Sequence, residues 1–171
     1  MVPVMIIVEG DKQQTVISEA AAIMLYLCEL HGETDLYPDN HLRLQINKWM
    51  FWAAEHFRQA SPMYFEEKVI APLMGKQANV HRLKEADKLI ETHATILNEH
   101  LKDRKFVVGD HVTLADFDLA AALSQMPRTK IPYERFSHIM AWKEYLENHI
   151  DAWRITGNNL NKRMNTALNI S

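Results

Sequence analysis

The chain has 171 residues, of which 47% are hydrophobic, and a formal net charge of −3. A chain of this length and apolar content can bury a full core, which argues against disorder and favours one domain, or one domain with part of another. Neither sign of charge gathers into a block, so nothing favours a nucleic acid or an anionic membrane surface as a partner.

The single cysteine and the lengths of the apolar runs indicate the cellular compartment that we expect for the protein. Cys28 is the single cysteine, which excludes an intrachain disulfide, and its apolar surroundings favour a buried structural thiol over a nucleophile. The longest apolar runs are shorter than the roughly 18 residues that a membrane span needs. We therefore expect a protein of the reducing cytoplasm that does not cross a membrane.

The opening of the chain predicts a β-hairpin followed by a helix. Residues 2–8 are rich in β-branched side chains and end at a glycine-containing turn, after which residues 14–17 are again extended. Ser18 is placed to cap a helix over residues 19–31 that stops at Gly32. This helix is apolar on nearly every side, so we expect it to be buried.

The rest of the chain is predicted to be helical, as a bundle of five or six helices. Helices are expected at about 40–72, 79–100, 113–127 and 133–149, with a short piece around Trp153. Pro62 should kink the first of them or split it into two halves, and Asn79 should cap the second. The asparagine-rich end, residues 158–171, is expected to be a mobile or loosely docked tail.

A capping box marks the helix that begins after Thr113. The Thr113 hydroxyl can accept a hydrogen bond from the third helical N–H group, while the Asp116 carboxylate reaches back to the Thr113 N–H. Both donors would otherwise be unpaired. This pairing accounts for Asp116 as a structural residue and not as a catalytic acid.

Taken in chain order, these features resemble the glutathione S-transferase family. The resemblance rests on the Val-Pro strand, the glycine-turn hairpin, the apolar helix from residue 19, and Val108-Gly109-Asp110 before the capping box, with Trp142 in a late helix. It covers nearly the whole chain. It implies a mainly α fold, in which a remnant β-hairpin plus helix of a thioredoxin-like domain (residues 1–36) precedes an all-helical C-terminal domain (residues 37–171). The family also forms dimers, so a homodimer is expected.

The resemblance implies that the member is truncated at its N-terminus. In the family, roughly fifty residues before the Val-Pro strand carry a tyrosine, serine or cysteine that stabilises the glutathione thiolate by a hydrogen bond. No position of this sequence matches that residue. We therefore assign no catalytic residue, and we expect little or no glutathione conjugation.

Four positions match the family's glutathione site. The family's cis-proline and the residue before it, whose backbone pairs with the cysteinyl part of glutathione, match Pro3 and Val2. Glu19 matches the acid that holds the γ-glutamyl amino group, and Ala20 replaces the usual serine donor. Losing that hydrogen bond costs about 1.5–3 kcal/mol, or one to two decades of affinity. The alternatives are an ordinary trans peptide at Pro3 and a first-turn acid that the helix dipole favours at Glu19.

Aromatic side chains between residues 49 and 65 are candidates for the family's hydrophobic co-substrate site. We single out Trp52, Phe57 and Tyr64; the alternative is that they form core. The histidines, including His93 and His100, show no metal-ligand spacing, so no metal is expected. No cofactor is predicted, and glutathione would be a co-substrate.

The first strand poses a packing problem, because without the neighbouring strand of the family fold one edge of its backbone N–H and C=O groups would be unpaired. Either a second copy pairs there, or residues 2–17 pack differently from the family fold. Two kinds of function stay open: a glutathione S-transferase-like protein with little activity, or a non-catalytic module of the same fold that binds a protein or an apolar small molecule.

Overall fold

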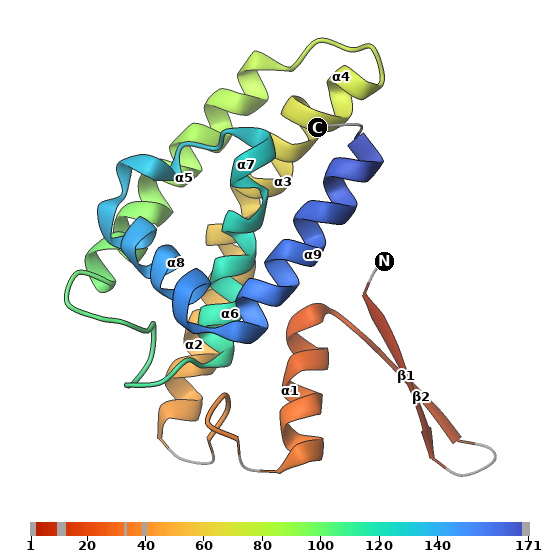
Figure 1. Ribbon diagram of the computed structural model, residues 1–171, viewed down its shortest axis with the longest axis vertical. Helices are drawn as coiled ribbons and strands as arrows, with labels where there is room; N and C mark the ends of the chain where they lie inside the picture. Colours follow the sequence, from red (N-terminus) through yellow and green to blue (C-terminus); the bar gives the residue numbers. More distant parts are fainter. Residues whose placement is uncertain (1–2, 10–12, 33, 39–40, 169–171) are drawn as a thin grey trace.

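The computed structural model describes residues 3–9, 13–32, 34–38 and 41–168, and it places a two-stranded hairpin beside a bundle of helices (Figure 1). The predicted fold class, a β-hairpin plus helix followed by an all-helical domain, is confirmed. The boundary after residue 36 stays a prediction.

The hairpin consists of β1 (Val4–Glu9) and β2 (Gln13–Ser18), which pair antiparallel with Ile6 opposite Val16. Successive strand residues point to opposite faces, so Val4, Ile6 and Val8 share one face with Val16. These four side chains are 48–64% exposed. Figure 1 shows the hairpin beside α1 and outside the rest of the helical bundle.

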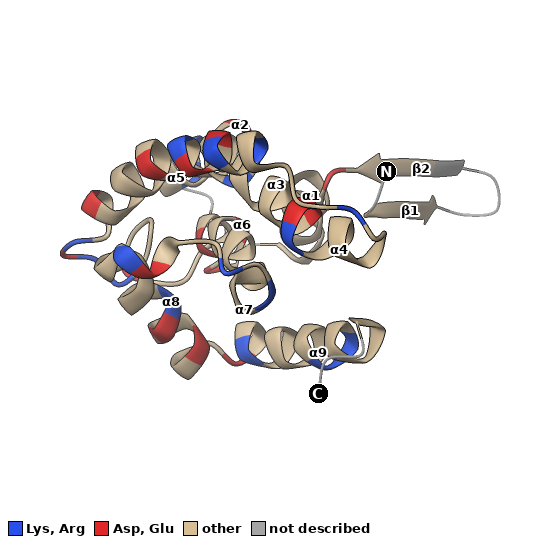
Figure 2. Cartoon of the chain, turned by 90° about the horizontal axis from the view of Figure 1, so that it is seen from above, with Lys and Arg blue, Asp and Glu red and all other residues tan. Residues whose placement is uncertain are grey.

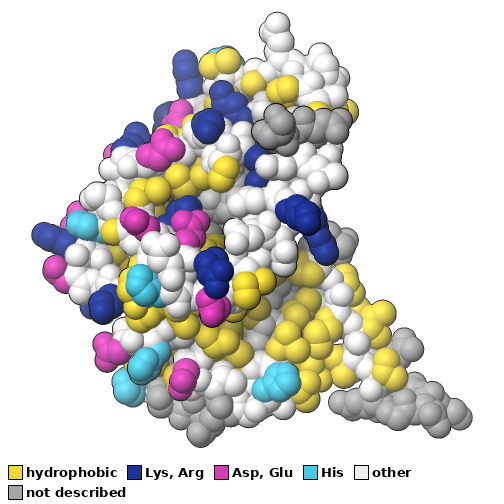
Figure 3. All heavy atoms as spheres, in the orientation of Figure 1, with side chains coloured by type: hydrophobic (Ala, Val, Ile, Leu, Met, Phe, Trp, Pro, Cys, Tyr) yellow, Lys and Arg dark blue, Asp and Glu magenta, His cyan; other side chains and the backbone are white. Residues whose placement is uncertain are grey.

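Two predictions about the first helix, α1 (Ala20–His31), are wrong. Ser18 is not its cap, because Ser18 still belongs to β2 and Glu19 takes the cap position without a side-chain hydrogen bond. The helix is not buried either, since Cys28 is its one buried residue. Leu27 and Leu30 are exposed, whereas Ala21, Met24 and Leu25 are partly buried against the core. Figure 3 shows hydrophobic side chains open to the surface near the hairpin. The predicted end at Gly32 is confirmed, with φ 78°.

The segment after residue 41 divides into α2 (Leu42–Glu55), the 3₁₀ turn η1 (Phe57–Gln59), α3 (Ala60–Phe65), the π-helical η2 (Glu66–Ile70) and α4 (Ala71–Leu73). The break falls at His56, where φ is −129°, and not at Pro62. Pro62 lies in the first turn of α3, where a helix does not need its N–H group.

The longest helix is α5 (Val80–His100), and its predicted cap is confirmed. Asn79 Oδ1 accepts from the backbone N–H groups of His81 and Arg82 at 3.0 and 3.2 Å. Its buried residues lie on one stripe at helical spacing: Ala86, Ile90, Ala94 and Leu97. The chain continues through α6 (Leu114–Ala121), η3 (Ala122–Gln125), α7 (Met126–Thr129), η4 (Tyr133–Arg135) and α8 (Ser137–His149).

The predicted capping box is present at the start of α6, and its acid does more than cap. Asp116 Oδ2 accepts from the Thr113 N–H and hydroxyl at 2.9 and 3.1 Å. Asp116 Oδ1 accepts from the Val107 N–H at 2.9 Å and from Trp142 Nε1 at 3.0 Å. Asp116 is fully buried, so one carboxylate joins the start of α6, the loop before it and α8.

The last helix, α9 (Asp151–Leu168), extends well beyond the short piece predicted around Trp153 and includes residues 158–168, which were predicted to be a mobile or loosely docked tail. It is one continuous helix, and Figure 2 shows it as an outer layer beside α7. Within the described residues, none of its side chains is fully buried. Its half-buried residues recur at helical spacing: Trp153, Gly157, Leu160, Met164 and Leu168.

In the part of the chain that the structure describes, no helix has the length and apolar content needed to cross a bilayer. Figure 2 shows basic and acidic residues interspersed along the helices, without a face of one sign.

Candidate functional site

Three of the four positions predicted to hold glutathione, Pro3, Glu19 and Ala20, lie around the start of α1. Val2 lies outside the described residues, and Pro3 is exposed. Glu19 is exposed and has φ 72°, while Ala20 is half-buried and begins α1. A non-glycine residue at positive φ costs about 1–3 kcal/mol, and such strain clusters at functional sites. Their contact with glutathione stays a prediction.

The three predicted co-substrate residues pack among core side chains. Phe57 is 2% exposed, and its ring lies 5.9 Å from that of Trp52 and 5.4 Å from that of Tyr133. The buried Tyr64 hydroxyl donates to Asp87 Oδ1, and burial together with this carboxylate raises the Tyr64 pKa above its usual value. The cavities described below are lined by other residues, so substrate contact by these three stays a prediction.

An open groove of about 350 Å³ lies between α3 and η3, next to the predicted aromatic residues. Its lining is mostly apolar: Arg58, Ser61, Pro62, Phe65, Ala121, Ala122, Ser124 and Gln125. We call it the α3–η3 groove. Sites for small molecules combine such an apolar wall with a few fixed polar groups.

Arg58 supplies the fixed charge of the α3–η3 groove. Its Nη1 lies 2.9 Å from Oδ1 of Asp118, whose side chain is almost completely buried. Burial raises the Asp118 pKa above its usual value, and the Arg58 guanidinium offsets part of that rise. Among the described residues, Asp118 Oδ2 has no hydrogen-bond partner. Sequence reasoning missed this pair because the partners lie sixty residues apart and no local pattern links them.

A second polar cluster joins the end of α2 to α5. The rings of His56 and His93 have centroids 5.2 Å apart, and Trp52 lies 6.0 Å from His93. Burial, and to a smaller extent His56, lowers the His93 pKa. The described part of the chain contains no group of three or more metal-ligating side chains.

Comparisons with known proteins agree with this architecture. The family model for the glutathione S-transferase C-terminal domain matches residues 63–149. Glutathione S-transferase theta-2 of Mus musculus is 29% identical over 143 residues, or 80% of this chain and 58% of that protein. The human theta-2 protein is 27% identical over the same shares. This chain thus spans 58% of the length of these relatives.

Solved structures show the same fold. Human glutathione transferase theta-2, in complex with glutathione and an unknown ligand, superposes with a TM-score of 0.74 at 22% identity, covering 91% of this chain and 65% of that chain. A delta-class glutathione transferase of Nilaparvata lugens gives a TM-score of 0.70 at 21% identity, covering 92% and 73%. The fold is therefore that of glutathione transferases. From the family match over half of its residues, the chain belongs to the glutathione S-transferase family.

Proposed function

We propose that this chain is a glutathione transferase-like binding protein. It holds glutathione weakly at the start of α1, holds an apolar molecule in the α3–η3 groove, and by itself conjugates the two slowly or not at all. The observation that carries the proposal is the strained Glu19 backbone directly before Ala20. A strained backbone persists where the surrounding structure holds it, and here it coincides with the position that the resemblance assigns to glutathione.

The substitution Ala20→Ser tests the glutathione part. A hydroxyl here restores the donor usual in the family, and a hydrogen bond to a charged carboxylate is worth about 1.5–3 kcal/mol. We expect glutathione to bind roughly ten- to a hundredfold more tightly to the variant in calorimetry. Ala54→Ser, at an exposed site on α2, is the matched control. Equal glutathione affinity of wild type and Ala20→Ser would contradict this assignment.

The catalytic part of the proposal is tested with glutathione and chlorodinitrobenzene. We expect the chain to give a rate close to that of the uncatalysed reaction in solution. A rate well above it would show that the chain activates the thiol by itself, and the binding-only reading would then fail.

The α3–η3 groove is tested with anilinonaphthalene sulfonate, an apolar fluorescent anion. Arg58 donates one of its five N–H groups to Asp118, which leaves donors for an acidic ligand group. Arg58→Lys keeps the charge opposite Asp118 but loses the planar fork, so we expect weaker probe binding. Phe65→Ala should weaken it through the lost apolar wall, whereas Arg163→Lys, exposed on α9, should not. Unchanged affinity in both groove variants would place the probe elsewhere.

The exposed hairpin face favours a second function, that of an interaction module which forms a homodimer. Val4, Ile6, Val8 and Val16 leave an apolar strip open to water. We expect a concentration-dependent mass that falls to the monomer when Ile6 and Val16 are both replaced by lysine. Ile155→Lys, at a comparably exposed site on α9, is the control. A wild-type chain that stays monomeric at high concentration would exclude this function.

A further inference from the structure

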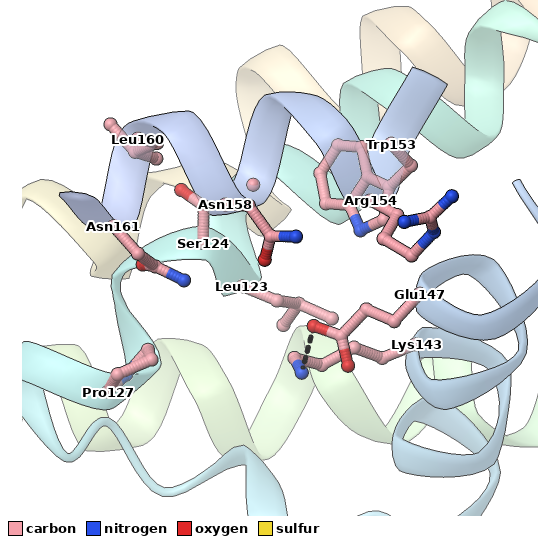
Figure 4. A pocket seen from close by; sticks show the side chains of 11 residues that line it. Leu123, Ser124, Pro127, Lys143, Glu147, Trp153, Arg154, Asn158, Leu160 and Asn161 are labelled. Carbon is pink, nitrogen blue, oxygen red and sulfur yellow. Dashed lines mark hydrogen bonds and ion pairs between the residues drawn. The ribbon is translucent and has the colours of Figure 1, made fainter. Parts of the chain in front are cut away.

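A cavity of about 150 Å³ lies beneath α9, walled by η3, α7 and α8 (Figure 4). Its apolar wall comes from Leu123, Pro127, Trp153 and Leu160, and polar groups surround it. It shares only Ser124 with the lining of the α3–η3 groove. We call it the α9 cavity, and it lies outside the function proposed above.

Gly157 keeps the α9 cavity open. It lies in the middle of α9 and lines the cavity, and a Cβ atom built on it would meet no atom within 4 Å. A mid-helix glycine costs about 0.5–1 kcal/mol relative to alanine. Close packing does not require glycine here, because the space around it is empty. The residue thus weakens the helix and leaves room in the cavity.

One cationic side chain of the cavity is placed to hold an anionic group of a ligand. Lys143 and Arg154 line the cavity together with one carboxylate, Glu147, but Arg154 is already paired with Asp151 at 2.6 Å, so the ligand's anionic group falls to Lys143. Lys143 Nζ lies 2.6 Å from Glu147 Oε1, and the Lys143 side chain is 19% exposed while that of Glu147 is 46% exposed. An ammonium group has three donors, so two remain for a ligand. Figure 4 shows the Lys143–Glu147 pair on the opposite side of the cavity from Trp153.

The volume limits the size of the ligand. An apolar cavity of about 150 Å³ accommodates one benzene ring. We propose that the α9 cavity binds a small aromatic carboxylate, with its ring among Leu123, Pro127 and Trp153 and its carboxylate at the Lys143 ammonium.

Benzoate is the probe, with calorimetry and the NMR signals of the tryptophan indole N–H groups as readouts. We expect saturable binding to one site, with the largest shift at Trp153. Gly157→Leu fills the cavity while keeping a good helix former, so benzoate binding should fall more than tenfold. Lys143→Met keeps the side chain's length and removes its charge; it should weaken benzoate about tenfold and leave the neutral benzyl alcohol unchanged.

Lys162→Met, at an exposed site on α9, is the control for the lost charge and should bind benzoate like the wild type. Circular dichroism verifies that each variant is folded. The proposal is overturned if benzoate does not saturate a single site, if Gly157→Leu binds it as well as the wild type, or if Lys143→Met weakens benzoate and benzyl alcohol equally. Anilinonaphthalene sulfonate binding at the α3–η3 groove should be unaffected by Gly157→Leu, so the two proposed sites fail independently.

Discussion

At the scale of single residues, Asp116 holds together parts of the chain that lie far apart in sequence. Its carboxylate receives hydrogen bonds from Thr113, Val107 and Trp142. The contact with Thr113 was predictable, because a capping box is a local pattern. The hydrogen bond from Trp142 joins residues that are 26 positions apart, and no local sequence pattern predicts it. The sequence therefore predicted the cap but not its link to α8.

Asp116→Ala tests this role. Three buried N–H donors would lose their acceptor, and each unsatisfied donor costs about 1–3 kcal/mol. We expect the free energy of unfolding in urea to fall by about 3–5 kcal/mol. Asp110→Ala, at an exposed site before the cap, should change it by less than about 0.5 kcal/mol. A loss below about 1 kcal/mol for Asp116→Ala would mean that the bonds to Val107 and Trp142 contribute little.

His93 gives a pH dependence whose sign follows from its pKa. Burial and His56 lower the folded-state pKa of His93 below the ordinary value of 6.5. As the pH falls through 6.5, this histidine becomes protonated in the unfolded chain while it is still neutral in the folded chain. The free energy of unfolding therefore decreases between pH 6.5 and the lower folded-state pKa. We expect His93→Gln to show a smaller loss of unfolding free energy between pH 7.5 and pH 5 than the wild type. Equal losses would contradict the assignment.

At the scale of elements, helices with a strong apolar stripe were predicted well and the others were not. In α5, which was predicted over residues 79–100, the buried residues recur at helical spacing. In α9 the half-buried stripe includes a glycine, Gly157, and is surrounded by asparagines, so the composition suggested a tail. The predicted start of α1 was wrong because serine is a common N-cap residue, whereas Ser18 is the last residue of β2 and pairs with Val4.

Two glycines allow a matched test of helix and turn. Gly157→Ala should raise the free energy of unfolding by about 0.5–1 kcal/mol, because alanine is the better helix former and nothing clashes with its Cβ. Gly109→Ala should lower it by about 1 kcal/mol or more, since Gly109 has φ +67° and a Cβ there would lie 3.3 Å from Leu42 Cδ1. Thermal and urea unfolding of both variants checks the opposite signs. The same sign for both would refute the argument.

At the scale of the whole molecule, a packed helical domain carries a hairpin that shares little of its core. The family and the mainly helical architecture were predictable from motifs in chain order. The α3–η3 groove and the α9 cavity were not predictable, because each is lined by side chains from several elements that are separated in the sequence. The Arg58–Asp118 pair, whose partners lie sixty residues apart, is of this kind.

Hydrogen exchange should separate the two parts. Amides of α5 and α6, whose buried residues lie at the centre of the bundle, should exchange only when the whole domain unfolds. Amides of β1 and β2 should exchange by local opening, orders of magnitude faster. Protection of β1 that grows with protein concentration would instead indicate a second copy on the hairpin. Uniform protection at low concentration would contradict the separation.

The hairpin also has a consequence for solubility. β1 carries four consecutive large aliphatic residues, Met5 to Val8, next to Val4, without a charge or proline among them. Short uncharged segments of high β-propensity at a sheet edge are templates for stacking into cross-β fibrils. Such stacking needs no unfolding of the helical domain. The least protected element of this fold therefore sets how concentrated the protein can become before it aggregates, and one lysine in β1 is the change that would raise that limit.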